Sequence, residues 1–200
     1  MDVNKLFSES PVFETRRLQL RRLSLADIND YYELASSPIV TAQTAWDRHI
    51  TYDDTRNYIN KILQRYEDKD EYHWGIVYKK SNRLIGRIGL IQIDPIHEKA
   101  ELGYVISDRY WNQGIVTEAT YPILDYGFKV LGLNRIEARC NFNNVESYRV
   151  MEKLGLSFEG ILRKQLKING IFTDQRIYSI LRDEFFSRQN SSEINRRAQI

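Results

Sequence analysis

The sequence predicts a mixed α+β fold, with a central, mostly antiparallel sheet of seven strands, one parallel and splayed strand pair, and about four flanking helices. Three observations support this prediction. Seven segments alternate apolar and polar residues, four others repeat apolar residues at helical spacing, and one strand–helix–strand unit lies in the second half of the chain. The unit matters most, because a helical crossover makes its two strands parallel neighbours.

The first part of the chain predicts one strand and two helices. Residues 12–23 alternate apolar and polar side chains and form the expected first strand. Residues 24–36 carry apolar residues at helical spacing, and Pro38 is expected to end that helix. A second helix is expected over residues 51–70, with the Thr51 hydroxyl as its cap.

The remainder predicts six strands and two helices. The expected strands are 72–80, 83–94, 99–107, 135–141, 156–170 and 171–187, and the expected helices are 117–131 and 144–155. Asn169–Gly170 is a strong hairpin turn signal between the last two strands. Helix 117–131 connects the strands on either side of it into the parallel pair. Where such a pair diverges, main-chain groups lack partners and a ligand can supply them.

Length and composition favour one soluble globular domain. The chain has 200 residues, and we expect a single domain over residues 1–188 followed by a polar, frayed tail over residues 189–200. The 29 basic and 27 acidic residues nearly balance, so no concentrated positive charge predicts nucleic-acid binding. No secretory signal or membrane-spanning segment is evident, and we expect a cytoplasmic protein without a membrane partner.

Metal binding and cysteine chemistry are not expected. The single cysteine, Cys140, lies in a predicted strand, and this position indicates an inert buried thiol and not a nucleophile. His49, His73 and His97 are spaced too widely for a local ligand motif, so we expect no metal.

The segment "YWNQGIVTEA", residues 110–119, lies between a predicted strand and a predicted helix. A glycine there lets the main chain approach a phosphate, and unpaired N–H groups at a helix start attract one. The expected donors are the main-chain N–H groups of Gln113, Gly114, Ile115, Val116 and Thr117. Taken alone, the same segment fits an ordinary turn better than a phosphate site.

Five segments together resemble the GNAT acetyltransferases, in the branch that contains the RimJ and RimL enzymes. They are "ETRRLQLRRLSLADINDYYEL", "AELGYVIS", "YWNQGIVTEA", "NNVESYRVMEKLGLSFEG" and "RKQLKING", within residues 13–185. The resemblance implies a GNAT-like fold and direct transfer of acetyl from acetyl-CoA, the expected cosubstrate, to an amine. Val116 departs from the family pattern, which has Gly or Ala there.

The resemblance also implies site residues. Main-chain groups of Val105 and Ile106 are implied partners of the pantetheine arm and the thioester, and Asn144 is implied to bind the cofactor. Ser147 is implied to lie near the sulfur and to assist the thiolate, although it also fits a hydroxyl that only satisfies main-chain groups. Asn144 equally fits an ordinary helix cap.

Glu101 is the first candidate for the base. It matches the family acid and alternates onto one face of its strand with Gly103 and Val105. Its distance from Val105 along the strand, roughly 13 Å, makes a water relay part of the expectation. A merely solvated surface glutamate remains an alternative, and Glu159 is a weaker candidate base.

The function we expect is N-acetylation of a protein or peptide N-terminus, with a ribosomal protein as the favoured acceptor. Acetylation of a small amine, such as an antibiotic, polyamine or amino acid, is the first alternative. A non-catalytic acyl-CoA-binding module is the second. The acceptor site is expected near residues 36–50 and 165–175, and the sequence leaves monomer and homodimer open.

Overall fold

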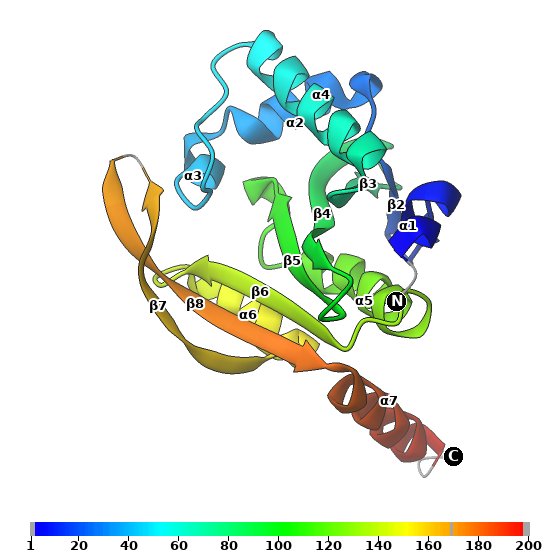
Figure 1. Ribbon diagram of the computed structural model, residues 1–200. Coiled ribbons are helices and arrows are strands. Elements are labelled where there is room, and N and C mark those ends of the chain that lie inside the picture. Colours follow the sequence, from blue (N-terminus) through cyan, green and yellow to red (C-terminus); the bar gives the residue numbers. More distant parts are fainter. Residues whose placement is uncertain (1–2, 169, 198–200) are drawn as a thin grey trace.

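The computed structural model describes residues 3–168 and 170–197. One eight-stranded sheet runs through it in the order β1-β2-β3-β4-β5-β6-β8-β7 (Figure 1). The strands are β1 (Phe13–Glu14), β2 (Leu18–Arg22), β3 (Tyr72–Tyr78), β4 (Arg83–Asp94), β5 (Lys99–Ile106), β6 (Arg135–Asn141), β7 (Ser157–Ile168) and β8 (Ile171–Leu181). The α-helices are α1 (Val3–Glu9), α2 (Ile28–Ala35), α3 (Pro38–Thr41), α4 (Tyr52–Asp68), α5 (Ile115–Lys129), α6 (Val145–Leu154) and α7 (Arg182–Arg197).

The sheet is antiparallel except between β5 and β6, as the strand–helix–strand unit predicts. These two strands pair in parallel from Lys99↔Arg135 to Leu102↔Ala138. Beyond Leu102, β5 continues beside β4, whereas β6 continues beside β8. The parallel strands therefore diverge after four paired positions, and the expected splay is confirmed.

Helices cover both faces of the sheet (Figure 1). On one face, α2 and α4 pack on each other and on β3 and β4. On the other face, α5 packs against α6 and β2, and α6 packs against β6 and β7. Large fully buried side chains, among them Trp74, Tyr31, Tyr72 and Phe128, fill the interior between these layers. Among the described residues, no helix has the length and apolar character that a bilayer crossing requires.

The start of α4 agrees with the predicted cap. The Thr51 hydroxyl accepts a hydrogen bond from the main-chain N–H of Asp54, and the Asp54 carboxylate accepts one from the N–H of Thr51. Pro38 has a second role that the sequence did not reveal. After α2 ends at Ala35, Pro38 occupies the first turn of the short helix α3, where a missing N–H costs nothing.

Two expectations near the ends of the chain were wrong. The expected strand 12–23 is broken into β1 and β2, which pair with each other and raise the strand number from seven to eight. The expected strand 171–187 ends at Leu181, whose N–H donates to the Glu184 carboxylate at the start of α7. Asn169, half of the predicted turn between β7 and β8, lies outside the described residues.

Helix α7 also corrects the expected frayed tail, because the chain stays helical through residues 189–197 (Figure 1). Phe185, which is 3% exposed, packs its ring 5.1 Å from that of Phe128 in α5. Gln189 donates to the Asp125 carboxylate of α5 at 3.0 Å. Tertiary contacts with α5 therefore support a helix whose polar composition alone did not predict it.

Candidate functional site

A cavity of about 280 Å³ opens where β5 and β6 diverge. It is lined by the end of β5, the turn before α5, the first turn of α5, helix α6, and the segment from Val40 to Thr44. The Asn141 side chain of β6 donates to the carbonyl of Gln43, which ties that segment to the end of β6. Since α6 packs on β6 and β7 and α3 packs against α2 on the other face, residues from both faces of the sheet line the cavity.

The glycine of "YWNQGIVTEA" caps α5. Gly114 has φ +69°, the left-handed conformation that favours glycine, and its carbonyl accepts the N–H of Glu118. The N–H groups of Ile115, Val116 and Thr117 precede the first helical hydrogen bond and point out of the helix start beside the cavity. The helix therefore begins two residues earlier than expected.

The surroundings of Gly114 fit a phosphate. A Cβ at this position would have only Arg17 Nη2 near it, at 3.9 Å, so space remains over the helix start. Arg149 and Lys153 of α6 line the same cavity and provide positive charge. Gln113 does not line it; its side chain donates to the carbonyl of Arg109 at 2.8 Å. The phosphate site predicted over residues 113–117 therefore begins at Gly114 and does not include Gln113.

Val116 lines the cavity but belongs mainly to the hydrophobic core. Its side chain is only 9% exposed, and its carbonyl accepts the Thr120 hydroxyl at 2.7 Å. The valine that departs from the family pattern therefore presents little of its surface to the cavity.

The hydrogen-bond register of β4 and β5 decides which main-chain groups face the gap. Ser107 N–H donates to the carbonyl of Ile85 at 2.9 Å. Bonded and non-bonded pairs alternate in an antiparallel ladder, so Val105 is in a bonded pair with Arg87, and its main-chain groups face β4. The groups of Tyr104 and Ile106 face β6 and the gap, with the Ile106 carbonyl accepting the Trp111 indole N–H at 3.0 Å. Val105 lines the cavity, but the main-chain groups that face the gap belong to Tyr104 and Ile106 and not to Val105.

Ser147 lies in the first turn of α6, at the wall of the cavity. Its N–H donates to Asn144 Oδ1 at 3.0 Å, which makes Asn144 the cap of α6 as well as a lining residue. The Tyr104 hydroxyl lies 2.9 Å from Ser147 Oγ and also donates to the Ser147 carbonyl at 3.0 Å. Burial raises the pKa of the neighbouring Cys140 thiol to about 11, against the opposing hydrogen bond of Ser147. Cys140 is therefore a protonated, buried thiol, as predicted.

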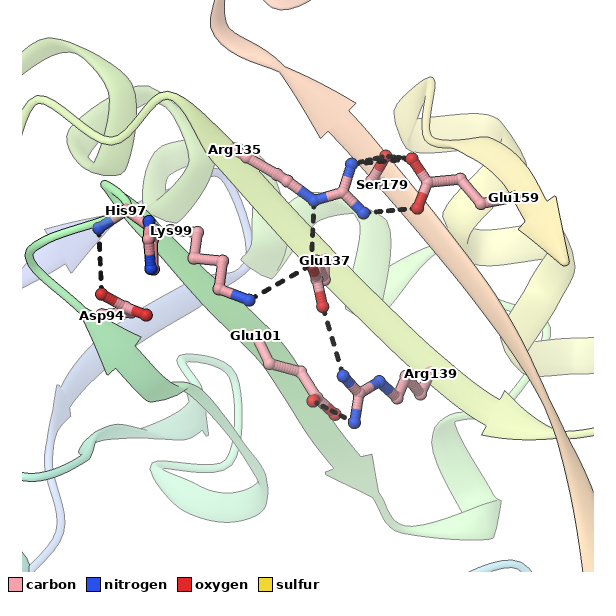
Figure 2. A network of polar contacts seen from close by, with 9 residues as sticks. All are labelled: Asp94, His97, Lys99, Glu101, Arg135, Glu137, Arg139, Glu159 and Ser179. Carbon is pink, nitrogen blue, oxygen red and sulfur yellow. Dashed lines mark hydrogen bonds and ion pairs between the residues drawn. The ribbon is translucent and has the colours of Figure 1, made fainter. Parts of the chain in front are cut away.

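Glu101 lies on the opposite face of the sheet, the face that carries α2 and α4. Figure 2 shows its carboxylate beside Arg139 of β6, with Glu101 Oε2 3.4 Å from Arg139 Nη1. Burial raises the pKa of Glu101, while the charge of Arg139 opposes that shift. Glu101 is not among the residues that line the cavity.

Glu101 belongs to a band of alternating charges across β5, β6 and β7 (Figure 2). Its acidic members are Glu101, Glu137 and Glu159, and its basic members are Lys99, Arg135 and Arg139. Hydrogen bonds from Arg135, followed by one from Ser179, lower the pKa of Glu159 to about 2 despite partial burial. The three carboxylates are matched by three cations, so the band has no net charge, and Glu159 is held as a carboxylate in an ion pair.

In the described part of the chain, no group of three or more His, Cys, Asp or Glu side chains is arranged to hold a metal ion. His73 is buried between Glu71 and Arg87, and His49 bonds Thr55, so both have protein partners.

The model of the acetyltransferase (GNAT) domain matches residues 17–157. The chain belongs to the GNAT family. YjcK of Bacillus subtilis, named a probable N-acetyltransferase, is 40% identical over 136 residues, which cover 68% of this chain and 75% of that protein. A GNAT-family acetyltransferase structure from Bacillus anthracis superposes with a TM-score of 0.77 at 30% identity, covering 86% of this chain and 99% of the other.

Relatives with a named acceptor differ in what they acetylate. "Putative ribosomal N-acetyltransferase YdaF" of Bacillus subtilis is 34% identical over 122 residues, covering 61% of this chain and 66% of that protein. A spermidine N(1)-acetyltransferase of Vibrio cholerae is 26% identical over 172 residues, covering 86% and 97%.

This GNAT protein is an N-acetyltransferase that acts on amines. GNAT enzymes use acetyl-CoA, and the splay, the helix start at Gly114 and the basic side chains of α6 suit the arm and phosphates of that molecule. Sequence reasoning missed two residues beside the cavity: Tyr104, whose hydroxyl contacts Ser147, and Arg17, whose guanidinium lies near Gly114. Alternation along β5 places Tyr104 on the face of Leu102 and Ile106, but only the tertiary structure reveals its contact with α6.

Proposed function

We propose that this enzyme transfers acetyl from acetyl-CoA to the α-amine of a protein N-terminus, in the manner of the RimJ and RimL enzymes, with a ribosomal protein as the favoured acceptor. Such an acceptor makes the cytoplasm the expected site of action. The two ends of the cavity divide the substrates: the helix-start end suits the phosphates, and the end at Gln43 and Thr44 admits the amine.

The choice of a peptide acceptor rests on the charge band, which has no net charge. A polyamine bears several positive charges and is best held by carboxylates that lack protein partners. On the strands beside the splay, Glu101 and Glu137 share Arg139, and Glu159 is held by Arg135. A peptide N-terminus carries a single charge, which it loses before reaction, and needs no such acidic surface. The ribosomal name of YdaF supports the same choice.

The chemistry requires a neutral amine, a polarised thioester carbonyl and a stabilised thiolate. Main-chain groups of Tyr104 and Ile106 that face the gap are suited to the arm and the thioester oxygen. Ser147 Oγ, at the wall of the cavity, is the proposed donor of a hydrogen bond to the departing sulfur, and Glu101 is the proposed base, acting through water. The bond between the amine nitrogen and the acetyl carbon forms as the carbon–sulfur bond breaks. Glu101 takes the amine proton through water and releases it to solvent, and the thiolate, stabilised by Ser147, takes a proton from solvent, so the net change is one proton from amine to thiol.

The experiment is to measure thiol release from acetyl-CoA with peptides that carry free N-termini. The same peptides with acetylated N-termini are the matched control, and spermidine and single amino acids are the small-amine comparison. We expect release with free peptides alone among these acceptors. Release with spermidine but with no peptide contradicts the proposed acceptor. Binding of acetyl-CoA without release for any amine identifies a binding module instead.

A further inference from the structure

We propose that Tyr104 is a positioning residue that sets the direction of the Ser147 hydroxyl for the departing thiolate; this inference rests on the proposed function. Tyr104 Oη lies 2.9 Å from Ser147 Oγ and 3.0 Å from the Ser147 carbonyl, so one phenol grips both the main chain and the side chain of one residue. The contact joins β5, on one side of the splay, to α6, on the other.

The phenol and the Cys140 thiol both lie beside the Ser147 hydroxyl, and because a thiol is only a weak acceptor, the phenol decides where the serine proton points. A tyrosine hydroxyl has one proton, and when it donates that proton to the Ser147 carbonyl, it accepts from Ser147 Oγ. Serine hydroxyls in helices otherwise turn back to bond a main-chain carbonyl one turn earlier. Tyr104 removes that alternative and keeps Oγ at the wall of the cavity, where the sulfur of the cosubstrate has to lie.

The same pair can follow the reaction without breaking a covalent O–H bond. As the carbon–sulfur bond breaks, the electron pair stays on sulfur, and the Ser147 O–H rotates to donate to the thiolate. The Tyr104 O–H then turns from the Ser147 carbonyl to Ser147 Oγ and replaces the hydrogen bond that Oγ gave up. Burial raises the pKa of Tyr104, so its hydroxyl remains a donor throughout.

The register makes Tyr104 suited to this role. Its main-chain groups face the gap, while its side chain crosses under α6, so the thioester and the serine are located by the same residue. The Tyr104 side chain is carried by the part of β5 that stays paired with β4, and support of this kind holds a hydroxyl within the narrow range that catalysis needs.

The test is a double-mutant cycle of Tyr104→Phe and Ser147→Ala, with acetyl-CoA and the best acceptor of the wild type. Tyr104→Phe is expected to lower kcat about tenfold, the effect of one lost hydrogen bond, with KM for acetyl-CoA within about twofold. In the Ser147→Ala background, the same change is expected to have no further effect. A full second loss in that background overturns the proposal, as does a raised KM with unchanged kcat.

Tyr178→Phe is the matched control. Tyr178 is also a buried strand tyrosine whose hydroxyl approaches α6, at Glu152 and 3.5 Å away, but it does not contact Ser147. This variant is expected to keep the wild-type kcat, and it measures the cost of removing a hydroxyl under the same helix.

A second measurement needs no acceptor and so separates this inference from the proposed function. The ultraviolet absorbance of the thiolate reports the pKa of the thiol of bound CoA, as the difference between protein with and without CoA. Both Tyr104→Phe and Ser147→Ala are expected to raise that pKa relative to the wild type, because each removes the directed hydrogen bond. A Tyr104→Phe titration identical to that of the wild type overturns the inference even if no amine is ever acetylated.

Discussion

Glu118, in the first turn of α5, accepts hydrogen bonds from both the main chain and the side chain of Arg17, which lies in the segment before β2. The Arg17 N–H donates to Glu118 Oε1 at 2.8 Å, and Arg17 Nε donates to Oε2 at 2.7 Å. The Thr15 hydroxyl adds a third hydrogen bond at 2.6 Å. These bonds, led by that of Thr15, lower the pKa of Glu118 although burial opposes the shift. The helix start that faces the phosphate site is thereby attached to the N-terminal edge of the sheet.

Glu118→Gln is therefore expected to lower the free energy of unfolding by about 2 kcal/mol, because charged hydrogen bonds to a half-buried carboxylate are replaced by weaker ones. Urea denaturation measures the loss. Glu9→Gln is the control, since the Lys5–Glu9 pair is exposed and 3.8 Å long and is worth at most about 1 kcal/mol. Equal losses in the two variants would show that the Glu118 contacts add nothing beyond a surface pair.

Gly114→Ala tests the phosphate cradle. Alanine at φ +69° costs about 1–2 kcal/mol of stability, and its methyl group occupies the space over the helix start. We expect the Kd of acetyl-CoA to rise about tenfold or more by calorimetry. Gly170→Ala is the matched control, because Gly170 has φ +82° and a Cβ at this position would have no neighbour within 4 Å. Gly170→Ala is expected to lose stability but to keep the wild-type Kd. An unchanged Kd in Gly114→Ala would refute the proposed phosphate site at the start of α5.

The buried imidazole of His73 is expected to make the protein less stable in mild acid. Its Nε2 lies 3.0 Å from Glu71 Oε2 and its Nδ1 accepts from Arg87 Nη1 at 3.1 Å, so a second ring proton would point at a guanidinium. Burial, with the opposing hydrogen bond of Glu71, lowers the pKa of His73 to about 4. The unfolded chain takes up that proton near pH 6.5 and the folded chain does not, so stability from His73 is complete above pH 6.5 and is lost as the pH falls toward 4.

The expected loss from His73 is about 2 kcal/mol between pH 7 and pH 5. Glutamine at this position can still accept from Arg87 and donate to Glu71 without titrating. Urea denaturation at the two pH values is therefore expected to show a smaller difference for His73→Gln than for the wild type. His97→Gln, in the exposed turn between β4 and β5, serves as the control and is expected to keep the wild-type difference. Parallel pH profiles for all three proteins would exclude His73 as the source.

How far the sequence predicts this molecule depends on whether a feature is local. The capping of α4 by Thr51 and the turn at Gly114 follow from patterns within a few residues, and the parallel pair follows from the order of consecutive elements around α5; the structure confirms them. Helix α7 was missed because its support comes from α5, more than fifty residues away in the chain. The main-chain groups of Tyr104, and not those of Val105, face the gap. This follows from the hydrogen-bond register, which the alternation of side chains does not reveal.

Glu101→Gln decides whether the charged face of the sheet takes part in catalysis. Burial raises the pKa of Glu101, and a base with a raised pKa retains more affinity for the proton it accepts from the amine through water. If Glu101 is that base, the variant loses the acidic limb that Glu101 gives to the profile of kcat/KM against pH, and kcat falls about a hundredfold. Glu159→Gln is the discriminating comparison, because Glu159 lies in the same charge band but is locked to Arg135. A changed profile in Glu159→Gln with a wild-type profile in Glu101→Gln would transfer the role to Glu159. Two wild-type profiles would make the band structural.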